Sequence, residues 1–296
     1  MAVPEAQLDT WSHQGSVTQS SDTYATVKAA LEAGTAPYAN KGCNVFLQGS
    51  YGNDTNIYRE SDVDVVFQLN SCFQHDLSGM PQEQQQAFKA SHSDATYTLG
   101  NFKTDVAAAL ASRFGIDVTH GDKAFLIAAR GARRSADVVA AMQYRRYHKF
   151  LSLSDQSFEE GICFYTSAGV TIVNYPKQHS ANLTRKHQTT ATWLKPMIRI
   201  LKNMRSRAVE KHLLEDGAAP SYYLEGLLYN VPDSLFGTSY GNSFVEAIKW
   251  LQATDRSKLL CANEQYYLLW EGSPVTWRAA KCDAFLAAVV KLWNEW

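Results

Sequence analysis

Cysteine is scarce in this 296-residue chain, and the few copies lie far apart. They are Cys43, Cys72, Cys163, Cys261 and Cys282. An odd number at such spacing supports neither a disulfide framework nor a Cys-x-x-Cys zinc pair. The eight histidines also lack the spacing of metal ligands, so nothing in the sequence predicts a zinc site. We expect each cysteine to be a small core residue in a reducing cytoplasm.

Long apolar runs and an excess of one charge are absent as well. No apolar run is as long as a transmembrane helix, and the sequence does not begin with the basic-then-apolar pattern of a signal peptide. We therefore expect no membrane partner. The formal net charge is -1, which argues against a long nucleic-acid partner but leaves room for a local groove. With 45% hydrophobic residues, the chain can bury a large core and divide into two lobes. We expect a cytoplasmic monomer.

The most informative segment is an apolar run that carries Asp62 and Asp64. Residues two apart on a strand point to the same side, so these carboxylates project together while Val63, Val65 and Phe67 occupy the other face. Two neighbouring carboxylates repel each other unless a cation lies between them. Mg²⁺ takes oxygen ligands and keeps waters that substrate phosphates can replace. The pair therefore predicts a magnesium site.

A Gly-Ser pair, Gly49-Ser50, follows the preceding apolar run at 45–47. Glycine lets a backbone approach a phosphate closely, and the amides that follow, with the Ser50 hydroxyl, can donate hydrogen bonds to it. A Gly-Ser pair alone is an ordinary turn, and an Asp-x-Asp alone is commonly a solvated strand edge. Both together, each next to an apolar strand, indicate a site for a metal-bound nucleoside triphosphate.

This combination resembles the DNA polymerase β-like nucleotidyltransferase superfamily, whose pattern ends with a third Asp on a later strand. Here that residue is Asp137, in a strand-like run at 136–140 that a turn at 130–134 joins to the run at 123–128. A two-metal site needs a further shared carboxylate. The resemblance implies that Asp62, Asp64 and Asp137 are catalytic and hold two Mg²⁺ ions, with Mn²⁺ as an alternative. Otherwise, Asp137 simply starts a strand.

The motif at 49–66 is similar, more narrowly, to the bacterial cGAS/DncV-like nucleotidyltransferases (CD-NTases), the oligonucleotide cyclases of CBASS antiphage systems. Segments 11–15, 173–177, 220–225 and 229–233 resemble the family's E clade. The resemblance implies an α+β fold. It would comprise a polymerase β-like nucleotidyltransferase core at 1–178, with a mixed sheet flanked by helices, and a helical lobe at 179–296 that closes the nucleotide cleft. The X-Pro step at Tyr175-Pro176 lies near this boundary.

The same resemblance implies nucleotide-binding roles outside the carboxylates. Gln48, Gly49 and Ser50 would bind the triphosphate, and Lys202 would reach it from the helical lobe with Ser221 as companion. Lys202 belongs to a basic stripe with Lys195, Arg199 and Arg205, which could instead be a solvated face. Ser221 follows Pro220 and could equally be a helix N-cap.

Asn174 bears on the choice of base, because in the E clade an Asn at this position accompanies pyrimidine use. Its amide carries one donor and one acceptor group, which match O4 and N3–H of uracil. The same amide, flipped, would serve cytosine. An Asn before a Tyr-Pro step can also be ordinary turn chemistry.

The resemblance thus implies an enzyme that joins UTP and ATP, or two UTP, into cyclic UMP–AMP or cyclic di-UMP with release of pyrophosphate. A downstream CBASS effector would read the product. Three alternatives stay open. They are a cyclase with a purine-only dinucleotide or trinucleotide product, a linear-product RNA or oligoadenylate nucleotidyltransferase, and a non-enzymatic nucleotide-binding partner.

Periodicity predicts helices at 16–33 and 101–114, paired strands at 162–165 and 170–173, and helices from 180 onward. Residues 70–100 read as a polar, exposed helical excursion. Ser243 to Glu246 has the form of a capping box. We expect exposed basic faces at Arg130, Arg133, Arg134, Arg145 and Arg146. We expect core packing by the aromatic residues near the C-terminus, Trp270, Trp277, Trp293 and Trp296.

Overall fold

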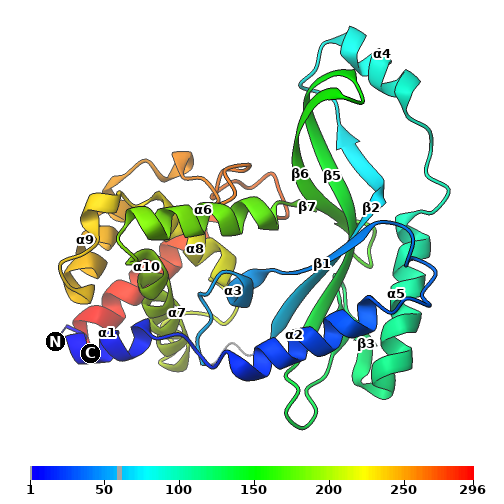
Figure 1. Ribbon diagram of the computed structural model, residues 1–296. Coiled ribbons are helices and arrows are strands. Elements are labelled where there is room, and N and C mark those ends of the chain that lie inside the picture. The colour runs from blue at the N-terminus through cyan, green and yellow to red at the C-terminus, as the bar shows by residue number, and fades with distance from the viewer. Residues whose placement is uncertain (1, 59–61) are drawn as a thin grey trace. The chain divides into compact units, whose positions relative to one another are not determined.

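The computed structural model describes residues 2–58 and 62–296 (Figure 1). Arg59, Glu60 and Ser61 of the motif segment lie outside the described residues. The elements, in chain order, are α1 (Glu5–Ser12), α2 (Thr18–Leu31), β1 (Cys43–Leu47), α3 (Gly49–Gly52), β2 (Val63–Asp76), α4 (Gln82–Ser91), α5 (Leu99–Phe114), η1 (Gly115–Asp117), β3 (Val118–His120), β4 (Phe125–Ile127), β5 (Ala136–Ser152), β6 (Asp155–Tyr165), β7 (Thr171–Asn174), α6 (Pro176–Thr189), α7 (Leu194–Glu210), α8 (Ser221–Asn230), η2 (Asp233–Leu235), α9 (Tyr240–Ala253), η3 (Arg256–Lys258) and α10 (Ala279–Asn294).

The chain forms two compact units. The sheet unit comprises Thr18–Leu47 and Asp62–Tyr175, and the helical unit comprises Met1–Val17, Gln48–Ser61 and Pro176–Trp296. The domain limits predicted from sequence, 1–178 and 179–296, differ from this division in the boundary, by three residues, and in the grouping of two earlier segments. Segments 1–17 and 48–61 group with the C-terminal helices, to which hydrogen bonds of Trp11, Ser12, Asn53 and Thr55 attach them.

The sheet unit contains one mixed sheet of seven strands, ordered β1-β2-β5-β4-β3, with β6 paired to β5 and β7 to β6. β2 and β5 are parallel, whereas the other pairs are antiparallel. Helices α2 and α5 cover one face (Figure 1). Val63, Val65 and Phe67 pack there against α5, as the alternation predicts. The predicted α+β fold class, with its mixed sheet and helical lobe, is confirmed.

Residues 70–100 differ from the predicted helical excursion. β2 continues to Asp76 past a register shift between Leu69 and Phe73, and only Gln82–Ser91 is helical before α5. The shift interrupts the alternation by which a strand is recognised in a sequence. α4 is also not fully exposed, since Phe88 packs against Tyr147 and Phe150 at the far end of β5 (Figure 1).

The helical unit is built around one apolar core, to which α1 and α6 to α10 all contribute. The capping box predicted at Ser243 is wrong: α9 begins at Tyr240 with Ser239 as its N-cap, and Ser243 is buried inside the helix. Of the four tryptophans expected in the core, Trp277 is buried, but Trp270 is exposed. No helix among the described residues is both long and apolar enough to cross a membrane.

Most of the arginines expected to be exposed are instead partly covered. Arg133 pairs with Asp117 and lies over the Phe114 ring. The Arg145 guanidinium lies 4.0 Å from the centroid of the Phe73 ring and 4.9 Å from that of Phe158. The five cysteines are free thiols, of which Cys163, Cys261 and Cys282 are buried.

Candidate active site

Strand register brings the predicted carboxylates together. β2 and β5 run parallel, and Asp64 is the direct cross-strand partner of Asp137. Asp62 immediately precedes β2, and its carboxylate accepts a hydrogen bond from the Ser135 hydroxyl, just before β5. Burial and the negative charge of Asp62 raise the pKa of Asp137. The three carboxylates therefore share one end of two neighbouring strands, where their charges oppose one another.

The chemistry of these side chains suits a hard divalent cation, because all three offer carboxylate oxygens. Within residues 2–58 and 62–296, no three His, Cys, Asp or Glu side chains are already gathered as ligands of one metal ion. The pairing of Asp64 with Asp137 is fixed by the sheet, whereas Asp62 is held by Ser135. A bound cation would offset the repulsion that raises the pKa of Asp137.

The Gly49–Ser50 turn belongs to the helical unit. Gly49 has φ +64°, the left-handed conformation that only glycine adopts readily, and opens the short helix α3. The turn is closed by backbone bonds, from Asn53 N–H to Gly49 O at 3.1 Å and from Thr55 N–H to Ser50 O at 2.9 Å. The first amides of a helical turn have no acceptor inside the helix, so those of Gly49 and Ser50 can donate to an anion.

Comparisons with known proteins agree with the combination of an Asp-x-Asp pair, a third aspartate and a Gly-Ser turn. The family model of the cGAS/DncV-like nucleotidyltransferase C-terminal helical domain matches residues 181–294. Over 298 residues the chain is 42% identical to the cyclic UMP-AMP synthase of Rhodothermus marinus, covering 100% of this chain and 99% of that protein. The chain belongs to the cGAS/DncV-like nucleotidyltransferases. It is thus similar to enzymes that synthesise cyclic nucleotides.

Two further comparisons bear on this membership. A solved structure of Rhodothermus marinus CdnE c-UMP-AMP synthase, with Apcpp and Upnpp, matches with a TM-score of 0.89 at 42% identity, covering 99% of this chain and 97% of that one. A cyclic dipurine nucleotide synthase of Elizabethkingia meningoseptica is 30% identical over 236 residues, covering 80% of this chain and 79% of that protein. The bases named for these family members therefore differ from one protein to another.

Lys202 lies on α7 of the cGAS/DncV-like helical domain and is not part of a solvated face. Its side chain is fully buried, and Nζ donates to the Thr55 carbonyl at 2.9 Å. Ser221 is the first residue of α8 and not its N-cap, which is Pro220. The Ser221 hydroxyl accepts from Arg205 at 3.1 Å. The roles of Lys202 and Ser221 towards a triphosphate stay predictions.

Asn174 ends β7 and is half-buried. Its Oδ1 accepts from the backbone N–H of Tyr175 at 2.8 Å, which fixes the orientation of the amide. A carbonyl oxygen has a second lone pair, so the amide keeps both an acceptor and its donors for a base. The structure therefore combines turn chemistry with an amide that retains the pattern expected for a uracil contact.

Sequence reasoning missed Glu225, a fully buried carboxylate in the middle of α8. It accepts hydrogen bonds from Asn53 and Thr55, which follow the Gly49–Ser50 turn. A signal existed, because Glu225 is the only charged residue in an otherwise apolar stretch from Tyr222 to Leu228. A lone acid at a core position of a helix indicates a buried acceptor with specific partners.

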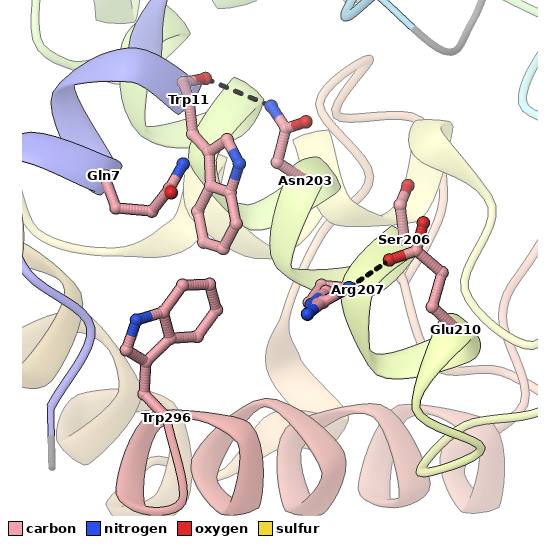
Figure 2. A pocket seen from close by; sticks show the side chains of 7 residues that line it. All are labelled: Gln7, Trp11, Asn203, Ser206, Arg207, Glu210 and Trp296. Atoms are coloured by element: carbon pink, nitrogen blue, oxygen red, sulfur yellow. Dashed lines mark hydrogen bonds and ion pairs between the residues drawn. The ribbon is translucent and has the colours of Figure 1, made fainter.

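Two pockets lie away from the predicted site residues. One, of about 320 Å³ in the helical unit, is lined by Trp11 of α1 and Trp296, whose rings meet edge to face with centroids 5.3 Å apart, and by Asn203, Arg207 and Glu210 (Figure 2). The other, of about 810 Å³ in the sheet unit, is lined by residues of β2, α4 and the segment before α5. Neither is lined by a residue predicted to bind nucleotide or metal.

Proposed function

We propose that this chain is a cyclic dinucleotide synthase that joins UTP and ATP into cyclic UMP–AMP, or two UTP into cyclic di-UMP, and releases pyrophosphate. The observation that carries the chemistry is the register of Asp64 with Asp137. The choice of uridine is supported by Asn174 and by the 42% identity to a cyclic UMP-AMP synthase. A purine-only product is the alternative, since a cyclic dipurine synthase is 30% identical.

Asp62, Asp64 and Asp137 would hold two Mg²⁺ ions, for which Mn²⁺ could substitute. Bound metal supplies positive charge to the triphosphate and lowers the pKa of the attacking ribose hydroxyl. The hydroxyl oxygen attacks the α-phosphorus, the bond to pyrophosphate breaks, and Asp137 takes up the hydroxyl proton.

Residues other than the three aspartates position the substrate. Gln48, Gly49 and Ser50 bind the triphosphate through backbone amides and the serine hydroxyl. Lys202 and Ser221 contribute from the helical domain, and the Asn174 amide reads the base. The linear dinucleotide then turns round in the same site and is closed by a second identical step.

The wider role that we propose is antiphage defence. The cyclic product would be a second messenger, read by a downstream CBASS effector. The enzyme would act as a monomer in the cytoplasm, where ribonucleoside triphosphates are abundant.

Asn174→Ser tests the choice of base directly. The change removes the amide but keeps a small polar group, so incorporation should shift from UTP towards purines by about tenfold, the loss expected for one bidentate contact. The measurement is the ratio of labelled bases in the product from an equimolar mixture of nucleotides. Asn44→Ser, on the exposed part of β1, serves as control and should leave the ratio unchanged. An unaltered ratio in Asn174→Ser would remove Asn174 from the base site.

A further inference from the structure

Glu225 is a buried carboxylate of the helical unit that is surrounded by hydrogen-bond donors. Its side chain is 2% exposed and accepts three hydrogen bonds, from His179 Nε2 at 2.6 Å, from Asn53 Nδ2 at 3.1 Å and from the Thr55 hydroxyl. A carboxylate only accepts, so His179 carries its hydrogen on Nε2. Burial alone would raise the pKa of Glu225, but the hydrogen bond and charge of His179 and the charge of Lys202 hold it below its usual value. Glu225 is therefore a buried anion.

The basic stripe of α7 holds the same loop from its other side. Lys195, Arg199 and Lys202 lie at i, i+4 and i+7, on one face of the helix. Lys195 Nζ donates to the Asp54 carboxylate at 2.9 Å, Arg199 donates to the Asp54 carbonyl at 2.6 Å, and Lys202 donates to the Thr55 carbonyl at 2.9 Å. Every residue from 53 to 55 thus has a partner on α7 or α8.

Residues 53–55 are joined directly to the phosphate-binding turn. Asn53 N–H donates to Gly49 O, and Thr55 N–H donates to Ser50 O. Between them Asp54 has φ +56°, an unusual conformation for a residue with a side chain, which requires support from its surroundings. The loop and the turn therefore form one rigid segment, and its only buried anionic partner among the described side chains of the helical unit is Glu225.

We propose that Glu225 is a positioning residue for nucleotide binding: its buried charge, through Asn53 and Thr55, keeps the Gly49–Ser50 amides in the conformation that accepts the triphosphate. This inference rests on the proposed function of that turn. A turn that is already ordered loses little entropy when the ligand binds. A turn released from Glu225 would have to be ordered by the nucleotide itself, which weakens binding.

Glu225→Gln and Thr55→Val test the proposal. Glutamine keeps the shape but removes the negative charge, and its amide nitrogen would face the Thr55 hydroxyl, which can accept instead of donate. Thr55→Val keeps shape and removes only the hydroxyl. Leu227→Ala, two residues along α8 and fully buried, is the control for simple destabilisation. The readouts are the Tm of each variant and its Kd for a non-hydrolysable UTP analogue at 25 °C.

We expect Glu225→Gln and Thr55→Val each to raise the Kd at least about tenfold, the loss expected for a hydrogen bond to a charged group. The Kd of the double variant should not exceed the higher of the two single-variant Kd values, because both changes break the hydrogen bond between the Glu225 carboxylate and Thr55. Leu227→Ala, at equal or lower Tm, should keep the wild-type Kd. An unchanged Kd in Glu225→Gln, or an equal rise in Leu227→Ala, overturns the proposal. Failure of the proposed function would look different: the wild type would bind the analogue but form no cyclic product.

Discussion

At the scale of single residues, the proposed chemistry depends on charges that the fold holds close together. Asp64 and Asp137 are cross-strand partners, and the charge of Asp62 adds to the cost of ionising Asp137. Such an arrangement lowers the stability of a protein in which no cation compensates it. Charged residues that lower the stability of the folded protein in this way are typical of a functional site.

Asp64→Asn and Asp137→Asn should therefore abolish turnover without unfolding the protein. Loss of a metal ligand removes several kcal/mol of transition-state stabilisation, which corresponds to a decrease in rate of about 10³-fold. In the absence of divalent metal, the Tm of each variant should equal or exceed that of the wild type, because one repelling charge is gone. Pyrophosphate release and thermal unfolding measure the two effects.

Asp76→Asn at the other end of β2 is the matched control and should keep wild-type turnover. Substantial turnover in Asp137→Asn would leave Asp137 as a strand residue only.

Glu225 gives a pH dependence whose sign follows from its lowered pKa. A carboxyl group with a lower pKa in the folded state adds stability above its unfolded pKa of about 4.5, and this stability is lost as the pH falls through the folded value. Wild-type Tm should thus fall more steeply than that of Glu225→Gln below about pH 4.5. The measurement is Tm from pH 7 to pH 3; parallel curves would contradict a buried anion.

At the scale of elements, the end of β7 is set by a close contact with β6. A Cβ on Gly161 would lie 2.7 Å from the Asn174 carbonyl oxygen and 3.0 Å from the Tyr175 ring. The Tyr175 ring is itself buried, and the Arg146 guanidinium lies 5.7 Å from its centroid. The position of Asn174 therefore depends on the absence of a side chain at Gly161.

Gly161→Ala should displace Asn174 and reduce the preference for UTP. Overpacking of this kind costs about 1–3 kcal/mol of stability. Gly34→Ala, with nothing within 4 Å of its added Cβ, should change neither quantity. Base selection in an equimolar nucleotide mixture and Tm report the outcome. Unchanged selection in Gly161→Ala at reduced Tm would show that the contact serves stability alone.

The sequence predicted those elements whose periodicity is regular. Helices α2 and α5, the hairpin that leads into β5, and the β6–β7 pair all occur where apolar spacing places them. The second half of β2 was missed because a bulge breaks the alternation at 70–72. The N-cap of α9 was misplaced because Ser243 and Ser239 offer similar local signals, and burial of Ser243 decides between them.

The placement of single residues followed the same rule. Asp62, Asp64 and Asp137 could be predicted to lie near one another because their motif is local in the chain or lies on a recognisable strand. The partners of Lys202 and Glu225 could not be found, because Thr55 is more than 140 residues away from both. Only the folded chain brings them together.

At the scale of the whole molecule, the two units are interleaved in the sequence. The chain leaves the sheet unit after Leu47, contributes residues 48–61 to the helical unit, and returns at Asp62. The Gly49–Ser50 turn and the Asp62–Asp64 pair therefore belong to different units although they are close in sequence. A boundary predicted from chain order alone could not separate them.

We propose that this chain synthesises a uridine-containing cyclic dinucleotide at Asp62, Asp64 and Asp137. The most direct test is to incubate the purified protein with Mg²⁺ and equimolar ATP, GTP, CTP and UTP, treat the products with phosphatase, and determine their masses. We expect a phosphatase-resistant product with the mass of cyclic UMP–AMP or cyclic di-UMP, which should be absent with Asp64→Asn. A linear product that loses its terminal phosphates, or a cyclic product with purines only, would contradict it.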